Sequence, residues 1–388
     1  MEDSTWREFL SNRRRIVIKI GSAVLASEIG IDETVIIQIA DQISKLKADG
    51  REIIIVSSGA IAAGILRLKG KIRPKTIPEK QALAAIGQGR LMEYYENAFS
   101  RFGIVVAQVL LTRDGLVSRR RYTNAKNTIQ TLLRWGIIPI INENDTVATD
   151  EIQFTDNDAL SVLVVDLADA DLLITLSDID GLYNKDPRVH PDAEIIDLVE
   201  EVDEATMAMA GSEPGRAGRG GMRSKLEAAR MVTSCGVPMV IAKGRRPECI
   251  LDIMKGRPIG TLFLPKKRPI LKGKKAWIAC TLNPEGVLRL DEGAVEAILR
   301  HGKSLLPVGI KGVDGQFEQG ACVVCVDPRG QRVASGIVNW DSRDLRKILG
   351  LRSKEISKML GLDVIPEVIH RDNMVVLGGS NNGRKKDD

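Results

Sequence analysis

Short apolar runs rich in β-branched residues alternate with longer helical patterns from residue 15 to about residue 264. This alternation restricts the chain to few fold classes. Strands that alternate with helices form right-handed βαβ units, whose parallel sheet is covered by helices on both faces. We therefore predict an α/β fold with a mainly parallel sheet sandwiched by helices. The predicted strands, each buried on both faces, span residues 16–20, 53–56, 104–111, 137–141, 172–176 and 239–241.

Helical patterns fill the intervals between these runs. Asp32 stands where a helix N-cap is expected, and Gly50 is the expected stop signal of the same helix, because glycine readily adopts the backbone conformation that ends helices. A helix is also expected directly after Gly59. The longer predicted helices span residues 32–48, 79–99, 123–135, 158–167 and 222–235.

The composition of the chain changes near Phe263. Prolines and lysines are concentrated in the segment that follows, and beyond it the strands are shorter and the turns denser. We predict a first domain over residues 1–264, a linker over 265–275, a small β-rich barrel domain over 276–374 and a disordered tail over 375–388. The strands predicted in the barrel domain span residues 277–281, 287–290, 309–313, 321–326 and 334–339, with one helix over 291–300.

Charge and cysteine content exclude several classes of protein. The chain carries 56 basic and 51 acidic residues, a balance that does not by itself indicate nucleic acid binding. Its five cysteines are few and scattered, which favours a reducing compartment, and Cys322 and Cys325 lack a second pair to complete a zinc site. No apolar run reaches the roughly 20 residues of a membrane span, and no secretory signal begins the chain. We expect a cytoplasmic protein with no membrane partner and no metal held by protein residues.

Ligands of open α/β sheets bind beyond the carboxyl ends of the strands, so the residues that end the apolar runs are the most informative. Lys19 interrupts the first run just before Gly21, and a lysine in a buried strand needs an anionic partner. A bound phosphate supplies that partner, and a structural ion pair is the alternative. The second run ends in Ser58 and Gly59, whose bare backbone N–H groups suit phosphate or carboxylate binding. A tight turn is the alternative, because glycine after a strand is often only that.

Polar clusters follow the later strands. Residues 142–145 read Asn-Glu-Asn-Asp, and residues 155–158 read Thr-Asp-Asn-Asp, of which Asp156 or Asn157 could simply cap the next helix. A glycine-rich basic loop over residues 215–221 enters a helix that carries Lys225, an arrangement typical of a phosphate cradle. Walker A, Rossmann and protein-kinase signatures are absent from the sequence. The residues thus indicate a site that moves phosphate.

These segments together resemble the amino-acid kinase superfamily and, within it, the branch that phosphorylates glutamate. The C-terminal part is similar to the PUA domain, which elsewhere reads RNA. The resemblance covers residues 15 to 374. Its motifs lie at residues 17–25, 57–64, 110–113, 141–145 and 220–225 for the kinase part, and at 291–294 and 304–310 for the PUA part.

The resemblance implies transfer of the γ-phosphoryl group of MgATP to the side-chain carboxylate of L-glutamate, the first step of proline biosynthesis. Lys19 would contact the transferred phosphoryl group, Lys225 the ATP phosphates, and Asp158 would organise both lysines. Glutamate would be bound by Ser58, Asp145 and Asn157. ATP would be held by Lys19, Ser177, Asp178, Arg219, Gly220, Gly221, Met222, Arg223, Ser224 and Lys225.

The resemblance also sets the expected partners. These are L-glutamate, proline as a feedback inhibitor, a downstream glutamyl phosphate reductase and further copies of the chain in a dimer or tetramer, with ATP and Mg²⁺ as cofactors. Arg219, Arg223 and Ser177 depart from the family pattern, and these departures bear on nucleotide affinity. Two alternatives stay open: an amino-acid kinase with another acceptor, such as acetylglutamate, aspartate, carbamate or a nucleoside monophosphate, and an RNA-binding protein of the PUA type.

Overall fold

A computed structural model describes residues 3–27, 30–112, 116, 119–148, 157–210, 221–266, 284–351, 353–360 and 367–376. The chain divides into two compact units, Met1–Ile270 and Leu271–Asp388. Most of the predicted linker over 265–275 and most of the predicted tail over 375–388 lie outside the described residues. No helix among the described residues is both long and apolar enough to cross a membrane.

The first unit contains an eight-stranded sheet in the order β5-β6-β4-β1-β7-β9-β10-β8. All six predicted strands are present, and their pairings are parallel. Only β10 runs antiparallel to its neighbour β9, so the predicted mainly parallel sheet is confirmed. The strands are β1 (Arg15–Ile20), β4 (Glu52–Ser57), β5 (Val106–Leu111), β6 (Ile138–Glu143), β7 (Leu172–Ser177), β8 (Leu198–Val199), β9 (Met239–Lys243) and β10 (Thr261–Phe263), and a separate hairpin pairs β2 (Ala26–Ser27) with β3 (Gly30–Ile31).

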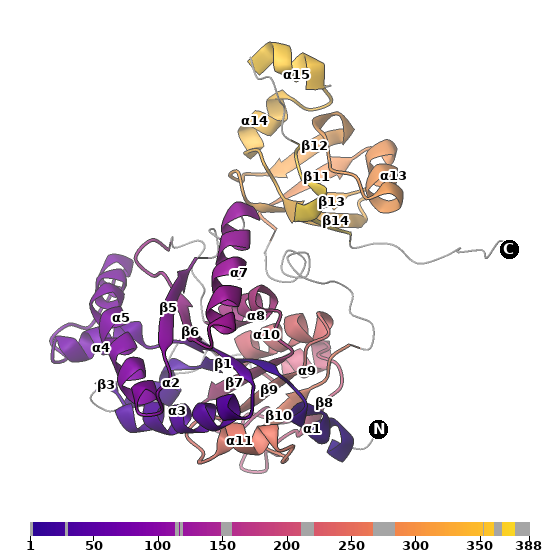
Figure 1. Ribbon diagram of the computed structural model, residues 1–388. Coiled ribbons are helices and arrows are strands. Elements are labelled where there is room, and N and C mark those ends of the chain that lie inside the picture. The colour runs from indigo at the N-terminus through magenta and orange to yellow at the C-terminus, as the bar shows by residue number, and fades with distance from the viewer. Residues whose placement is uncertain are drawn as a thin grey trace. The chain divides into compact units, whose positions relative to one another are not determined.

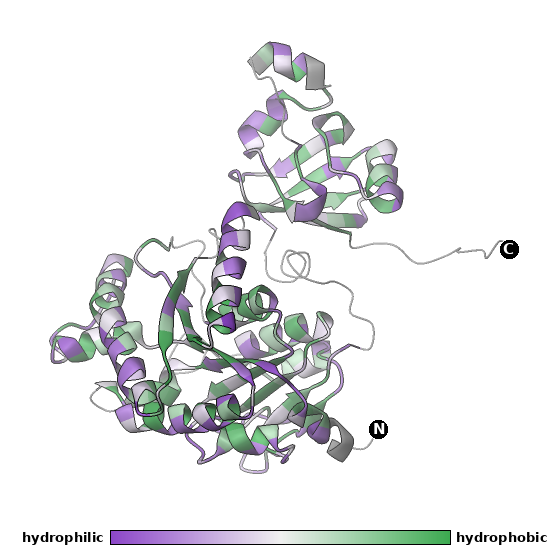
Figure 2. Ribbon diagram, viewed as in Figure 1, coloured by the Kyte–Doolittle hydropathy of each residue, from purple (hydrophilic) through white to green (hydrophobic). Residues whose placement is uncertain are grey.

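Helices cover both faces of this sheet (Figure 1). The layer of α3, α5 and α11 packs against one face, and α8 and α10 lie on the other, where α7 packs against α8. Figure 2 shows the apolar strands between these layers, whereas α7 is largely hydrophilic. The helices are α1 (Asp3–Ser11), α2 (Ser22–Leu25), α3 (Glu33–Ala48), α4 (Ala60–Arg67), α5 (Ile77–Ser100), α7 (Arg119–Arg134), α8 (Asn157–Ala168), α9 (Glu204–Ala208), α10 (Met222–Ser234) and α11 (Cys249–Met254).

Helix boundaries follow the predicted signals with one difference. Gly50 has a φ angle of 81° and ends α3 as expected. Asp32 occupies the N-cap of α3, but its side chain makes no capping hydrogen bond and pairs instead with Arg245, at 2.9 Å. The start of α5 is a capping box, in which the side chains of Thr76 and Glu79 accept hydrogen bonds from each other's backbone N–H groups.

Alternation along β1 decides which side chain faces which helix layer. Ile16, Ile18 and Ile20 belong to the core beneath α3 and α5. Because successive strand residues point to opposite faces, Val17 and Lys19 face α8. Lys19 is therefore buried at the carboxyl end of a central strand, on the face that α8 and α10 cover.

The prediction that every strand is buried on both faces was wrong for β5. This strand lies at the edge of the sheet, where Gln108 and Leu110 are exposed. Val105, just before it, is 62% exposed. An apolar run alone does not reveal whether its strand is central or marginal, because strand order depends on pairing between distant segments.

Two glycines let α4 and α5 approach each other closely. A Cβ atom at Gly64 would lie 2.0 Å from the carbonyl oxygen of Leu83, and one at Gly87 would lie 1.9 Å from that of Ala60. Any larger residue would force the helices apart. The contact places the middle of α5 against the first residue of α4, directly after the end of β4.

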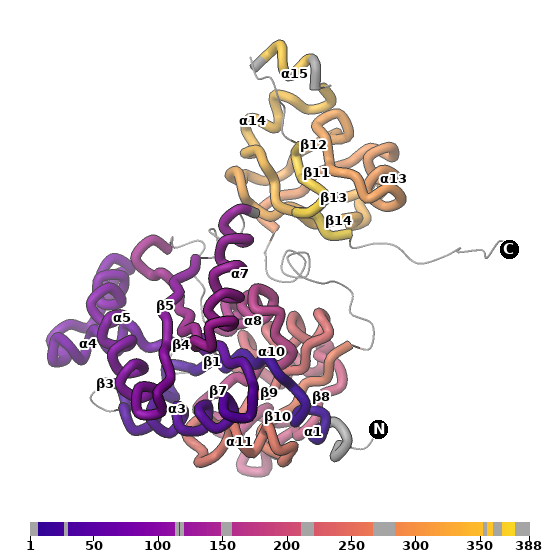
Figure 3. The backbone as a smooth tube through the Cα atoms, viewed as in Figure 1, coloured from indigo at the N-terminus to yellow at the C-terminus, as the bar shows by residue number. Residues whose placement is uncertain are grey.

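Helix α1 was not predicted, and it lies beside β8 and β10 in the backbone trace (Figure 3). Arg7 holds α1 in this position. Its buried guanidinium donates to the carbonyl oxygens of Ile259, Asp197 and Gly260 at 3.0, 2.7 and 3.1 Å. Each of these oxygens gains a charged donor, which makes the hydrogen bonds stronger than neutral ones. The short strands β8 and β10 were also missed, because two or three residues show no period.

The second unit is built on a five-stranded sheet in the order β12-β11-β13-β14-β15. Its strands surround a separate apolar core, which confirms a small β-rich domain. The predicted strand over residues 277–281 lies outside the described residues. The elements are β11 (Gly286–Leu290), α13 (Glu292–His301), η1 (Pro307–Gly309), β12 (Ile310–Gly315), β13 (Cys322–Val326), β14 (Arg332–Ile337), α14 (Ser342–Lys347), α15 (Ser353–Leu360), η2 (Arg371–Asn373) and β15 (Met374–Val376).

Candidate active site

A buried ion-pair cluster occupies the carboxyl edge of the central strands. The ammonium group of Lys19, at the end of β1, contacts Oδ1 of Asp158 in the first turn of α8. The ammonium group of Lys225, in the first turns of α10, lies 3.5 Å from the other oxygen, Oδ2. Lys19 and Asp158 are each 1% exposed, so water screens their charges little. The structure thus brings the three predicted catalytic residues together.

The start of α10 supplies the next group around Asp158. The hydroxyl of Ser224 donates to Asp158 Oδ2 at 2.9 Å and also lies 2.9 Å from the carbonyl oxygen of Gly221, the N-cap residue. Met222 is half-buried and Arg223 is exposed. The remaining predicted loop residues, Arg219 and Gly220, lie outside the described residues.

The start of α8 also carries Asn157, which connects the ends of two strands. Its amide nitrogen donates to the backbone oxygen of Ser57 at 2.7 Å, to the hydroxyl of Ser58 at 2.9 Å and to Oδ1 of Asn142 at 3.0 Å. Asn157 therefore binds across the sheet edge rather than capping its helix. Ser58 and Asn157, both predicted to bind glutamate, are in direct contact. The other capping candidate, Asp156, lies outside the described residues.

The other predicted residues lie at the ends of neighbouring strands. Asp145 is half-buried in the turn after β6. Ser177 is the last residue of β7, and its hydroxyl lies 3.0 Å from Oδ1 of the exposed Asp178. Gly59, after β4, has a φ angle of 113°, which only glycine adopts easily, and it turns the chain from the strand into α4.

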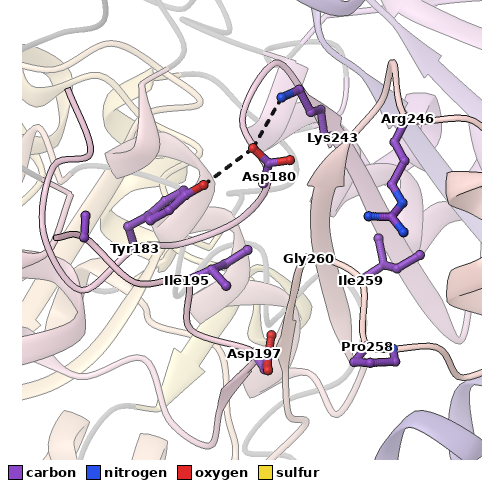
Figure 4. Close-up of a pocket in the computed structure, with 10 residues that line it drawn as sticks. Asp180, Tyr183, Ile195, Asp197, Lys243, Arg246, Pro258, Ile259 and Gly260 are labelled. Carbon is purple, nitrogen blue, oxygen red and sulfur yellow. Dashed lines mark hydrogen bonds and ion pairs between the residues drawn. The ribbon is translucent and has the colours of Figure 1, made fainter. Parts of the chain in front are cut away.

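A pocket of about 440 Å³ lies beyond the ends of β7 and β9 (Figure 4). Lys243 pairs with Ser177 in the register of these two strands. In Figure 4 the side chains of Lys243 and Tyr183 both point toward Asp180, whose Oδ2 lies 3.4 Å from the ammonium group and 3.5 Å from the phenol oxygen. The pocket is lined by Asp180, Tyr183, Ala193, Ile195, Asp197, Lys243, Arg246, Pro258, Ile259 and Gly260.

Known proteins match both units of the chain. The amino acid kinase family matches residues 14–243, and the PUA domain matches residues 286–360. The chain belongs to the amino acid kinase family. The glutamate 5-kinase of Geobacter sulfurreducens is 50% identical over 369 residues, which cover 95% of this chain and 99% of the relative. That of Thermoanaerobacter pseudethanolicus is 47% identical over 364 residues, which cover 94% and 98%. The crystal structure of UMP kinase from Ureaplasma parvum matches with a TM-score of 0.46 at 17% identity, over 65% of this chain and 99% of that chain.

The candidate site contains residues that the sequence analysis missed. Asn142 was noticed only as part of a polar cluster, yet it is 4% exposed and hydrogen-bonded to Asn157. Gln88 and Tyr95 of α5 were not noticed at all. They lie seven residues apart, and so on one face of the helix, where polar groups interrupt an apolar pattern. That interruption was the available signal.

The arrangement can neutralise and position anions. Two ammonium groups contact one carboxylate. The N-terminal ends of α8 and α10 both lie at this cluster, because α8 begins with Asp158 in its first turn and α10 carries Ser224 and Lys225 near its start. The positive ends of helix dipoles and lysine ammonium groups both favour phosphate. The geometry is therefore suited to phosphoryl transfer, and the polar network next to it is suited to a small polar acceptor.

Proposed function

We propose that this chain transfers the γ-phosphoryl group of ATP to the side-chain carboxylate of L-glutamate and forms L-glutamyl 5-phosphate. The observation that carries the proposal is the buried cluster of Lys19, Asp158 and Lys225, which keeps an excess of positive charge at the sheet edge. Positive groups held in a water-poor site stabilise the charge that spreads over a transferring phosphoryl group. The names of the glutamate 5-kinase relatives support glutamate as the acceptor.

The reaction needs no general base. The side-chain carboxylate of glutamate is already ionised at neutral pH, because its ordinary pKa is about 4.3. One carboxylate oxygen attacks the γ-phosphorus, the bond between that phosphorus and the β,γ-bridging oxygen breaks, and ADP leaves with the electron pair. No proton moves. The nucleotide enters as its Mg²⁺ complex, in which phosphate oxygens and water are the ligands that Mg²⁺ prefers.

Each lysine has its own task in this proposal. Lys19 lies near the end of the central strand β1 and contacts the transferred phosphoryl group, whereas Lys225 lies near the start of α10 and contacts the ATP phosphates. Asp158 holds both ammonium groups through its two oxygens. Because reacting anions must be aligned closely, fixing the two lysines in advance lowers the barrier.

Glutamate lies, in this proposal, beside the network at the ends of β4 and β6. Ser58 and Asn157 already form one unit, through a 2.9 Å hydrogen bond. Asp145 offers a carboxylate for the ammonium group of the substrate. The nucleotide lies on the other side of the cluster, where Ser177 ends β7 and the loop before Lys225 enters α10.

We further propose that the pocket between Tyr183 and Arg246 receives the nucleoside part of ATP. One of its lining residues, Lys243, pairs in register with Ser177. Its walls combine apolar side chains with Lys243 and Asp180, the mixture common in cofactor sites. Replacement of Tyr183 by alanine should raise the KM for ATP and leave that for glutamate unchanged in a steady-state assay.

A hydroxamate assay tests the function directly. Hydroxylamine traps an acyl phosphate as a coloured hydroxamate, so incubation of the chain with MgATP and L-glutamate should give product. Parallel reactions test the alternative acceptors, and the release of ADP measures their turnover. These acceptors are acetylglutamate, aspartate, carbamate and a nucleoside monophosphate. Turnover of one of these in place of glutamate would contradict the proposal.

The remaining partners are proposals with their own tests. The acyl phosphate product is unstable, so we propose that glutamyl phosphate reductase consumes it. We propose proline as an inhibitor that competes with glutamate.

The exposed edge strand β5 supports a homo-oligomer, because unpaired strand edges are usually covered, and light scattering would distinguish a dimer from a tetramer. RNA binding by the second unit stays a prediction, for which salt-dependent binding is the test, and so does a cytoplasmic location.

A further inference from the structure

One polar atom close to the proposed glutamate site is buried without a partner. Gln88 lies on α5 and is half-buried, and its amide nitrogen Nε2 has no hydrogen-bond partner among the described residues. A buried donor without a partner destabilises the folded state, so native structures rarely keep one without a use. Gln81, two turns earlier, shows the ordinary case, because its amide nitrogen donates to the carbonyl oxygen of Ala148 at 2.9 Å.

Neighbouring hydrogen bonds settle which end of the Gln88 amide is the nitrogen. The backbone N–H of Glu143 donates to Oδ1 of Asn142, at 2.9 Å, which fixes the orientation of that side chain. Nδ2 of Asn142 must then donate to Gln88, at 2.8 Å, and the accepting atom of Gln88 must be Oε1. Nε2 is left as a donor by elimination.

Two independent contacts place Gln88 at the acceptor side of the site. Through Asn142 it is the last member of a chain of hydrogen bonds that runs from Ser58 through Asn157. Through its neighbour Gly87 it lies against Ala60, the first residue of α4 after Ser58 and Gly59. Asn157 precedes Asp158 in α8, and Gln88 lies two hydrogen bonds beyond Asn157 in this series.

The face of α5 that carries Gln88 is held firmly. Tyr95, seven residues later on the same face, is fully buried and shares a 2.8 Å hydrogen bond with the hydroxyl of Ser57. The hydroxyl of Ser57 donates to the carbonyl oxygen of Ser58, so the phenol of Tyr95 is the donor of the shared bond. Burial raises the pKa of Tyr95 and keeps that proton in place.

From this placement, and resting on the proposed function, we propose that Gln88 is a specificity-determining residue that donates from Nε2 to the α-carboxylate of glutamate. A carboxylate oxygen is the acceptor that a buried amide donor prefers, and hydrogen bonds to charged groups are the stronger ones. The reacting side-chain carboxylate points to Lys19, and the α-carboxylate at the other end of the substrate meets Gln88.

Two substitutions separate this role from a structural one. Gln88→Leu removes both amide atoms, whereas Gln88→Glu keeps an oxygen that can accept from Asn142 and replaces only the donor. We expect Gln88→Leu to raise the KM for glutamate by about tenfold to a hundredfold and to leave the KM for ATP unchanged. Gln88→Glu should raise the KM for glutamate further, because the negative charge of the new side chain repels the substrate carboxylate.

A structural role predicts the opposite order. If Gln88 served only to hold Asn142, Gln88→Glu would resemble the unmodified chain and Gln88→Leu would impair both substrates; that order would overturn the inference. If Gln88→Leu does not fold, the KM of Gln88→Glu for glutamate still tests the inference. Gln130, whose amide joins Arg15 to Ala168, supplies matched controls, and Gln130→Leu and Gln130→Glu should leave both KM values within about twofold.

A ligand without the α-carboxylate identifies the group that Gln88 binds. Inhibition by 4-aminobutyrate, measured against glutamate, should have the same inhibition constant in the unmodified chain and in Gln88→Leu. Equal weakening of both ligands would overturn the assignment to the α-carboxylate. Absence of turnover by the unmodified chain would overturn the proposed function itself, while normal turnover with unchanged KM in both Gln88 variants would overturn this inference alone.

Discussion

The two ends of helix α8 place the same residue type in opposite electrostatic settings. Asp158 lies in the first turn, between the ammonium groups of Lys19 and Lys225. Asp166 lies in the last turn, where its nearest donor is the neutral hydroxyl of Tyr122. The helix dipole favours a carboxylate at the first position and disfavours one at the second.

The pKa of Asp166 shows the consequence of this difference. Burial raises it above the ordinary range, the hydroxyl of Tyr122 and the charge of Lys126 lower it, and Asp169 raises it again. Asp158 is buried more deeply yet has two cations beside it. Burial therefore does not decide alone whether a carboxylate serves as a charge, because the partners that neighbouring elements supply decide it too.

Asparagine at the two positions should give very different results. Asp158→Asn leaves two buried lysines without a counter-charge, and we expect a loss of about 3–5 kcal/mol in the free energy of unfolding and of about a hundredfold or more in kcat. Asp166→Asn should keep kcat within about twofold. Denaturant titration and the hydroxamate assay measure the two quantities. Equal effects of the two substitutions would refute the contrast.

The lysines extend the comparison. Lys19→Ala and Lys225→Ala should each lose most of kcat while the chain still folds, because each removes a charge that the transferred phosphate needs. Lys126→Ala is the matched control, since Lys126 pairs with Asp169 at 2.7 Å at the other end of α8. Its kcat should stay normal. Near-normal turnover by either site variant would show that the cluster is only structural.

Removal of one hydroxyl at each end should have smaller effects. Ser224→Ala deletes the 2.9 Å hydrogen bond to Asp158, and we expect kcat to fall by about tenfold. Tyr122→Phe deletes the corresponding bond to Asp166 and should cost about 1 kcal/mol of stability with kcat unchanged. Circular dichroism melts and initial rates separate the two outcomes. A fall in kcat for Tyr122→Phe would link the two ends of α8.

The smallest expected effect is a pH dependence of stability from Asp166. Its pKa is raised in the folded chain, so the folded state holds the proton more tightly than the unfolded state does. The stabilisation that this proton provides is complete below the ordinary pKa of an aspartate and is lost as the pH rises through the raised value. Unfolding free energies measured between pH 4 and 7 should therefore fall less steeply for Asp166→Asn. Parallel curves for the two proteins would contradict this.

Much of this contrast could not be read from the chain. The run 158–167 was predicted as a helix from its pattern, and the structure extends it by one residue at each end. Asp158 was identified because a motif brought it to attention. Asp166 was not, since nothing local shows that Tyr122 of α7 will lie against it. The same limit hid Gln88, whose proposed role depends on a hydrogen bond from Asn142 of another element.

Local chemistry was enough to predict the long strands and helices, the glycine that ends α3 and the residue types suited to phosphate. These follow from side-chain periodicity and backbone geometry within a few residues. Only the tertiary structure decided that β5 lies at the sheet edge, that Arg7 attaches α1 to the carbonyl groups near β10, and that the oxygens of Asp158 meet two lysines. The physical reason is that pairing and burial join segments far apart in the chain, so the partners of a charged group depend on the whole packing and not on its neighbours in sequence.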